Sequence, residues 1–308
     1  MCYLAQVSRA SYYRHLEKAA PDEAEMAMRV AIQEVVLAHR RRYGYRRVTE
    51  DLHRKGMMVN HKRVLRIMGE DNLLAIRYRK YIMTTDSRHD CEVYLNLAAR
   101  MTLTGVNQLW VADITYIRLR VEFVFLAVVI DRFSRKVVGW ALDRTLAARV
   151  AVTALEHAIG RRQPPPGVVH HSDQGIQYAC ADYAEVLKKN DMIPSMSRPA
   201  NPYDNAACES FMKTLKQEEI YCNAYNDFED LGAHLEEFVG NYYNRLRLHS
   251  ALGYRTPEEF ERDSATPVGP GGNPGGATMK FFGPRNLDTR STGSSDPASD
   301  SLREISRP

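Results

Sequence analysis

Apolar residues in the first part of the chain recur at helical spacing. Between Glu23 and Arg41 they return every three to four positions, which predicts an amphipathic helix. A second helix is predicted from Tyr45 to Lys55, followed by a break at Gly56, and a third begins after Asn60, whose side chain suits an N-cap. A helix, a short glycine-containing turn and a basic helix are typical of a helix-turn-helix.

The third of these helices has a charged and an apolar set of residues. We expect the charged set to lie outside and the apolar set to lie largely inside: His61, Lys62, Arg63 and Arg66 against Val64, Leu65, Ile67 and Met68. Such a helix could enter a DNA major groove. A plain helical bundle with one charged face fits the same pattern, so both interpretations stay open.

Strand-like patterns dominate the middle of the chain. Three strands are predicted first and are followed by alternating helices and strands; the strands span 109–118, 121–131, 136–143, 168–171 and 192–197, and the helices 147–160, 179–190, 204–220 and 229–245. This is the element order of a ribonuclease H-like α/β fold. We therefore predict a mixed five-stranded sheet with flanking helices, preceded by an all-α region.

Composition divides the chain further. We assign residues 1–83 to the helix-turn-helix-like DNA-binding region, 84–104 to a linker and 105–262 to the α/β core. The remainder, 263–308, becomes rich in Gly, Pro and Ser with few large apolar side chains, so we expect a disordered tail.

Three acidic residues stand in settings that distinguish them from the other acids of the chain. Asp113 interrupts an apolar strand, where an unpaired carboxylate would be costly to bury, and Asp173 ends a short strand at the edge where ligands collect. Glu209 stands on a predicted helix, and 35 residues separate it from Asp173. Taken singly, each could be a solvated charge or a helix cap, but together they suggest a two-metal site for phosphoryl transfer.

Several motifs in fixed order resemble one family. They are the segments around the three acids (110–116, 170–178 and 201–211), the run Ile130–Trp140, and a final group of Tyr243, Asn244, Arg247, His249, Leu252, Gly253, Tyr254, Thr256 and Pro257. Over residues 1–260 the chain resembles the transposases of bacterial insertion sequences, the OrfB type with a DDE triad and an integrase catalytic core.

The resemblance implies a DNA transposase. In such an enzyme Asp113 would bridge two Mg²⁺ ions, for which Mn²⁺ can substitute, while Asp173 and Glu209 would each hold one. Water would cut the DNA at the terminal inverted repeats of the element, and the exposed 3′ hydroxyl would attack target DNA. A homo-oligomer on DNA and a partner protein from an upstream reading frame are further expectations.

Two other functions remain possible for the same residues. One is a ribonuclease H-like nuclease that cuts without joining, and the other is a catalytically inactive DNA-binding regulator. The terminal repeat, the target preference and the number of subunits cannot be obtained from the sequence.

Basic residues are unevenly distributed along the chain. Residues 1–90 carry 18 Lys and Arg against 11 Asp and Glu, and the remainder 24 against 27, which suits a basic arm that binds DNA, although a solvated helical surface fits too. Lys213 and Lys216 lie four and seven residues after Glu209 and so share its helix face. The DNA-binding residues we predict are Arg46, Arg47, Lys62, Arg63, Arg66, Lys213, Lys216 and Arg247.

The cysteines, histidines and apolar runs of the sequence argue against a membrane-spanning protein and against a zinc site. Five cysteines without a CxxC pair indicate reduced thiols, and no apolar run reaches the roughly 18 residues of a membrane span, so we expect a cytoplasmic protein of bacterial type, nucleoid-associated when bound to DNA. His170 and His171 are adjacent on a strand and point to opposite faces, which argues against a zinc site. Both are expected in the core or at its rim.

Overall fold

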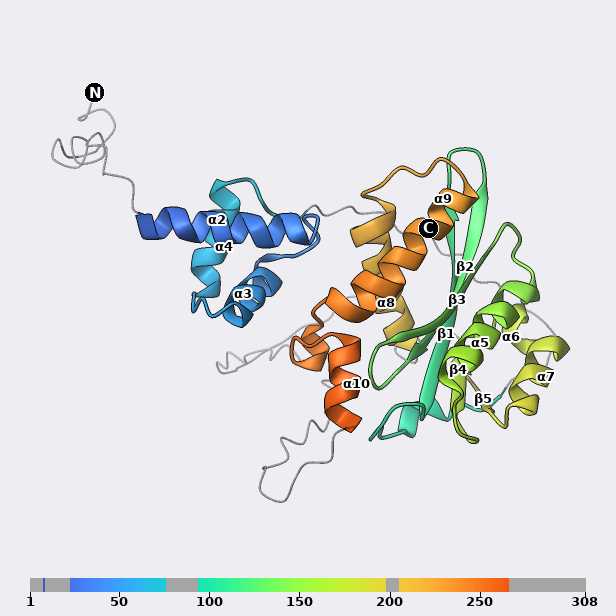
Figure 1. The fold of residues 1–308 in the computed structure, drawn as a ribbon. Coiled ribbons are helices and arrows are strands. Elements are labelled where there is room, and N and C mark those ends of the chain that lie inside the picture. Colours follow the sequence, from blue (N-terminus) through green and yellow to red (C-terminus); the bar gives the residue numbers. More distant parts are fainter. Residues whose placement is uncertain (1–7, 9–22, 76–93, 198–204, 266–308) are drawn as a thin grey trace, which may run out of the picture. The chain divides into compact units, whose positions relative to one another are not determined.

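The computed structural model describes residues 8, 23–75, 94–197 and 205–265 (Figure 1). Three helices form the N-terminal region: α2 (Glu23–Ala38), α3 (Tyr45–Arg54) and α4 (His61–Glu70). Asn60 caps α4, because its side chain accepts a hydrogen bond from the backbone N–H of Lys62 at 2.8 Å. The three predicted helices and the N-cap are therefore confirmed.

The prediction for one residue of α4, Leu65, is wrong. Val64, Ile67 and Met68 are buried as expected, but the side of the helix that carries Leu65 faces solvent and this residue is 40% exposed. The apolar stripe of α4 is thus narrower than the composition of the helix suggested.

The sheet has five strands in the order β3-β2-β1-β4-β5. They are β1 (Leu109–Arg118), β2 (Phe123–Asp131), β3 (Val137–Asp143), β4 (Val169–Ser172) and β5 (Ile193–Met196). The first three pair antiparallel, whereas β4 is parallel to both β1 and β5. The predicted mixed sheet of a ribonuclease H-like core is confirmed.

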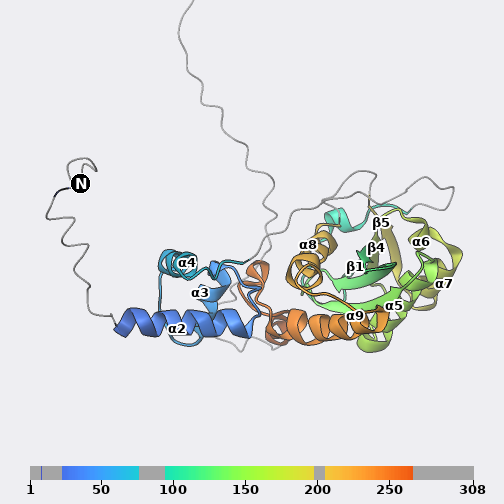
Figure 2. The same ribbon diagram turned by 90° about the horizontal axis from the view of Figure 1, so that it is seen from above.

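Successive side chains along β1 point alternately into two layers of the hydrophobic core, one on each face of the sheet. Trp110 and Ala112 pack with α5 (Ala148–Arg162) and α7 (Ala181–Lys189), which follows the short helix α6 (Ile176–Ala179). Leu109, Val111 and Ile117 belong to the opposite layer. That layer is covered by α8 (Ala206–Leu215), α9 (Phe228–Glu236) and η4 (Glu237–Leu246), so helices cover both faces of the sheet (Figure 2).

The remaining elements are short. A 3-10 turn η1 (Ala98–Arg100) precedes the sheet, the π-helical segment η3 (Lys216–Ile220) continues α8, and η5 (Ser250–Leu252) leads to α10 (Pro257–Ala265). A reciprocal cap starts α10: the N–H of Glu259 donates to Thr256 Oγ1 at 3.1 Å, and the N–H of Thr256 donates to the Glu259 carboxylate at 2.9 Å.

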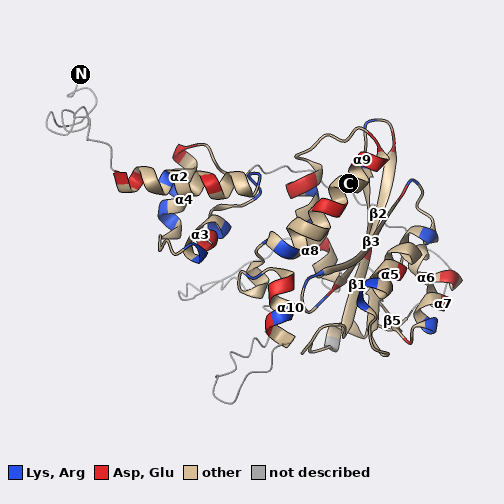
Figure 3. Cartoon of the chain, in the orientation of Figure 1, with Lys and Arg blue, Asp and Glu red and all other residues tan. Residues whose placement is uncertain are grey.

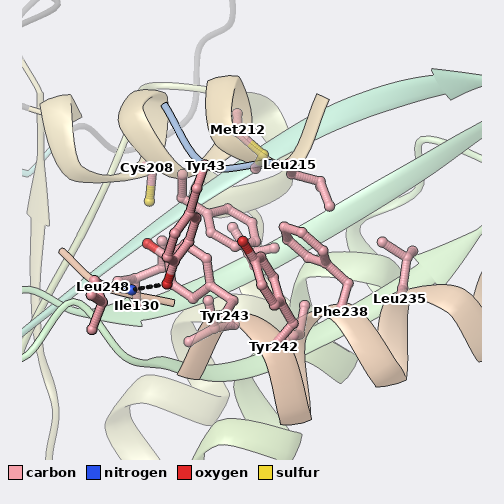
Figure 4. Packing of buried hydrophobic residues seen from close by; sticks show 14 of the residues in the cluster. Tyr43, Ile130, Cys208, Met212, Leu215, Leu235, Phe238, Tyr242, Tyr243 and Leu248 are labelled. Atoms are coloured by element: carbon pink, nitrogen blue, oxygen red, sulfur yellow. Dashed lines mark hydrogen bonds between the residues drawn. The ribbon is translucent and has the colours of Figure 1, made fainter. Parts of the chain in front are cut away.

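The turn after α2 belongs to the core. Tyr43 is fully buried among aromatic residues of η4 (Figure 4). Its hydroxyl accepts from the N–H of Leu248 at 3.0 Å and donates to the carbonyl of Leu246 at 3.1 Å. Beside it, Arg42 forms an ion pair with buried Glu219. Deleting the N-terminal region would therefore remove part of the core as well.

Gly139 on β3 tests how closely α5 lies on the sheet. A Cβ added there would come within 2.7 Å of the Ala158 Cβ and closer still to the Ala154 carbonyl oxygen. We expect Gly139→Ala to lower the free energy of unfolding by about 1–3 kcal/mol through overpacking. Gly160→Ala is the matched control, because nothing lies within 4 Å of its added Cβ and the residue is helical. It should stabilise by about 0.5–1 kcal/mol. Urea unfolding of both variants decides, and equal stability of the two would contradict this packing.

Candidate active site

Strand register brings two of the three predicted acids together. In the parallel pair of β1 and β4, Leu109 lies opposite Val169 and Val111 opposite His171. Continued two residues further, past the end of β4 at Ser172, this register brings Asp173 beside Asp113 of β1. Neighbouring strands are roughly 4.8 Å apart, so both acids lie near the carboxyl end of β4 and on the side of Val111, which α8 covers.

Helix α8 brings the third acid to the same face. Glu209 lies in its first turn, and Phe211, Met212 and Leu215 on the other side of the helix are buried against the sheet. Asn205 ties the start of α8 to β1, because its amide Nδ2 donates to the Ala112 carbonyl at 3.1 Å. The Oδ1 atom of Asn205 is buried without a hydrogen-bond partner.

Backbone amides orient the carboxylates of Asp113 and Asp173. The N–H of Gly175 donates to Asp173 Oδ1 at 2.9 Å, and the N–H of Ile114 donates to Asp113 Oδ1 at 2.9 Å. A Cβ at Gly175 would lie 2.9 Å from the same oxygen of Asp173. A side chain at Gly175 would therefore displace the carboxylate, which explains the Asp-Gln-Gly sequence at this turn.

The three acids act on one another electrostatically. Burial, followed by the negative charge of Asp173 and then by that of Glu209, raises the pKa of Asp113 to about 7, while the N–H of Ile114 and the ammonium of Lys216 oppose the rise. Concentrated negative charge of this kind favours binding of a cation. Hard oxygen donors fit magnesium, which takes one or two carboxylates and completes its shell with water and phosphate.

No single ion could contact three acidic or histidine side chains as they stand, among the residues that the structure describes.

The two lysines of the α8 face occupy different surroundings. Lys216 is half-buried with its ammonium 5.2 Å from the centre of the Tyr116 ring, and the charge of Asp113 acts on it. Burial nevertheless lowers the pKa of Lys216. Lys213 is exposed and lines a pocket of about 490 Å³ beside α8.

Arg247 and Arg47 are held by one carboxylate. Arg247 is buried and donates to both oxygens of Glu218 at 2.8 and 2.9 Å, and Arg47 donates to the same carboxylate at 3.1 Å. Burial alone would raise the pKa of Glu218, but these arginines bring it below its usual value. The structure thus places Arg247 inside the protein, where it orients Glu218, and not on an exposed surface.

The predicted DNA-binding residues of the arm lie along α3 and α4 (Figure 3). Arg46 and Lys62 are exposed, and Arg46 donates to the Tyr45 hydroxyl at 3.1 Å. Arg63 and Arg66 are exposed too, but both pair with Glu25 of α2, at 2.7 and 3.1 Å. Arg66 also pairs with Glu70 at 2.8 Å, so a DNA phosphate would have to replace Glu25 at Arg63 and both acids at Arg66.

Both histidines of β4 lie in the core, as expected. His170 Nε2 lies 3.0 Å from the Tyr183 hydroxyl, and burial lowers the pKa of His170 to about 3. His171 lies between the hydroxyls of Ser195 and Ser197, at 2.9 and 3.0 Å. Within the described residues Cys180, Cys208 and Cys222 are free thiols.

Residues 104–202 and 190–257 match two integrase core domains, and residues 22–81 match an HTH-like domain. The chain is 34% identical to the IS600 uncharacterized 31 kDa protein of Shigella sonnei over 84% of this chain and 97% of that protein. It is 35% identical to transposase InsF of IS3A from Escherichia coli, covering 85% and 92% of the two chains, and 36% identical to the IS904 transposase of Lactococcus lactis, covering 75% and 92%.

A solved structure, a chain of the simian T-cell lymphotropic virus intasome, is 18% identical over 79% of this chain and 78% of that one, with a TM-score of 0.46. The matched domains define a DDE-type polynucleotidyl transferase. With relatives of this identity over most of its length, the chain belongs to the insertion-sequence transposases that carry an integrase core. The family acts in DNA transposition, binds DNA and depends on divalent metal ions.

None of the helices among the described residues is both long enough and apolar enough to cross a bilayer.

The sequence contained three residues of interest that our predictions missed. Arg40 and Arg41 line the pocket beside Lys213, and their signal was the basic run from His39 to Arg42. Asn205 had no comparable signal, because its bond to β1 depends on the folded positions of α8 and the strand.

Asp113 should make the stability of the metal-free protein depend on pH. Its pKa is raised from 3.8 to about 7, so the native state binds more protons than the unfolded state between about pH 4 and pH 7, and stability falls as pH rises through that window. Asp113→Asn removes this cost. At pH 8 and in the presence of a chelator, we expect the variant to be more stable by up to about 4 kcal/mol, and the gain to vanish near pH 4. Urea unfolding at both pH values measures it, and equal stability at pH 8 would contradict the raised pKa.

Proposed function

We propose that Asp113, Asp173 and Glu209 form the catalytic triad of this transposase and hold two Mg²⁺ ions, with Mn²⁺ as a substitute. In this proposal Asp113 contributes to both ions, Asp173 to one and Glu209 to the other. The observation that carries it is the parallel register of β1 and β4, because Asp113 lies on β1, Asp173 directly follows β4, and the helix of Glu209 covers this face of the sheet.

When bound, such ions neutralise charge on the attacking and leaving oxygens of an in-line displacement at phosphorus. The proposed reactions are hydrolysis at the ends of the element, which frees a 3′ hydroxyl, and attack of that hydroxyl on target DNA. The protein supplies the rigid frame: the backbone N–H groups of Ile114 and Gly175 fix two carboxylates, and the side chain of Asn205 fixes the start of α8 against β1.

The basic residues supply DNA binding in this proposal. Lys216 lies near Asp113, where a phosphate oxygen of the substrate would be its counter-ion, and Lys213 extends the basic surface along α8. Arg46, Arg47, Lys62, Arg63 and Arg66 are proposed to bind the terminal repeats from the helix-turn-helix-like region. Since two ends must be paired before joining, we propose a homo-oligomer on DNA, with the product of an upstream reading frame as a further partner.

Neutral variants of the triad test the metal assignment. Asp113→Asn, Asp173→Asn and Glu209→Gln should each reduce magnesium-dependent cutting and joining by at least a hundredfold, because amides are poor ligands for hard cations. DNA binding should stay nearly unchanged. Labelled DNA carrying candidate element ends gives both products on one gel.

Asp182→Asn is the matched control for the triad, because Asp182 is an exposed acid on α7. It should cut and join as the wild type does. Strand transfer by any of the triad variants would overturn the assignment, and cutting without joining by the wild type would indicate a nuclease.

The two lysines after Glu209 should fail in different ways. Lys216→Ala removes a half-buried ammonium next to Asp113 and should slow cutting of saturating DNA at least tenfold, because substrate phosphate loses a partner at the acids. Lys213→Ala removes an exposed charge and should mainly weaken binding. Single-turnover rates and dissociation constants separate the two effects, and identical behaviour of both variants would show that α8 does not face DNA in this way.

A further inference from the structure

A pocket of about 490 Å³ beside α8 is strongly cationic. Among the described residues, six basic side chains line it and Glu218 is the only acidic one: the basic residues are Arg40, Arg41, Arg42, Arg47, Lys213 and Arg247. Some of these charges are already compensated, since Arg42 pairs with Glu219, and Arg47 and Arg247 share Glu218. The exposed Arg40, Arg41 and Lys213 supply the excess positive charge.

The backbone at the rim of this pocket is unusual. Arg40 and Arg41 both have left-handed conformations, with φ of 49° and 58°, directly after α2 ends at Ala38. Arginine gains no local hydrogen bond from that conformation, in contrast to Asn or Asp. Strained residues of this kind tend to occur where function requires a particular side-chain position. The turn is held from both sides, by the carbonyl of Asn72, which accepts from Arg41, and by buried Tyr43.

The position of the pocket relates it to the proposed active site. Ser210, Thr214 and Gln217 line it from the face of α8 and η3 next to the one that carries Glu209. From Glu209 to Gln217 the helix rises about 12 Å, which corresponds to three or four base pairs of duplex at about 3.4 Å each. A DNA strand whose scissile phosphate lies at the acids could therefore reach the pocket within the same helical turn.

We propose that this pocket binds the DNA backbone of the element end a few nucleotides from the cut, with Arg40, Arg41 and Lys213 on its phosphates. The inference rests on the proposed function for the position of the cut, but the binding itself does not require catalysis. The pocket takes the polyanionic backbone of DNA without reading its bases. Residues of the turn after α2 and of the helix that carries Glu209 both line the pocket, so one DNA strand would contact both segments.

The first test removes charge from the rim. Arg40→Gln combined with Arg41→Gln should weaken binding of a fluorescein-labelled 30-base-pair duplex, measured with chelator at 150 mM salt. Two lost phosphate contacts reduce the slope of log K against log salt by about 1.8 and the affinity by on the order of 30-fold. The control is Lys188→Gln combined with Lys189→Gln, two adjacent exposed cations at the end of α7. It removes the same charge and should change the slope by less than half as much.

The second test measures, in the wild-type protein, whether bound DNA shields a thiol that lines the pocket. Cys222 is an exposed free thiol that lines the pocket, whereas Cys180 is a partly exposed thiol outside its lining. Saturating duplex should slow alkylation of Cys222 at least fivefold and leave Cys180 unchanged, as followed by peptide mass spectrometry. Thermal unfolding of the Arg40, Arg41 variant shows whether its fold is intact. If the variant does not fold, protection of Cys222 in the wild type still tests the pocket.

The outcomes separate this proposal from the catalytic one. Equal Cys222 reactivity with and without DNA, or an unchanged salt slope in a folded Arg40, Arg41 variant, would overturn the pocket even if the wild type cuts DNA with magnesium. Protection of Cys222 in a protein that fails to cut would support the pocket and count against the proposed function.

Discussion

The parallel pairing of β1 with β4 is the constraint on which the rest of the structure depends. It brings Asp173, the residue directly after β4, beside Asp113 on β1, where burial and the charge of Asp173 raise the pKa of Asp113 to about 7. Such an arrangement is unfavourable in the absence of a cation. It persists because β1 is held on its other edge by nine register positions with β2, and on both faces by buried side chains. The rigidity of the sheet therefore balances the repulsion of the acids.

Residues that the family resemblance marked outside the triad hold this frame together. Asp131 is buried and its carboxylate accepts from the N–H groups of Asn107, Phe133 and Ser134, which fixes the turn between β2 and β3. Asn244 bonds both backbone groups of Val137 on edge strand β3 at 3.0 Å. These motif residues have structural roles. The motifs that carry the family resemblance therefore include two kinds of residue: the acids proposed for catalysis, and residues whose hydrogen bonds hold the sheet and its turn in place.

The sequence was most informative where a local pattern decides the outcome. All five strands, the N-cap of α4 and the buried face of α8 follow from alternation, helical spacing or one side chain. Prediction failed where the answer depended on distant partners. Leu65 is exposed because α4 buries a narrower stripe than its composition allows, and Arg247 is buried because Glu218 lies beside it in the fold. The triad assignment and the domain boundaries remain predictions.

The cations of the chain differ in how readily they could exchange a carboxylate for a phosphate. Arg63 and Arg66 pair with Glu25 at the surface, where ion pairs are weak and solvent competes, so DNA can replace that partner easily. Arg42 and Arg247 pair with largely buried carboxylates, and leaving such a charge unpaired costs about 3–5 kcal/mol. They are therefore fixed parts of the protein that shape the pocket and hold Glu218 and Glu219. Arg40, Arg41 and Lys213 are exposed at the rim of that fixed wall, which makes them the charges best placed to meet a phosphate backbone.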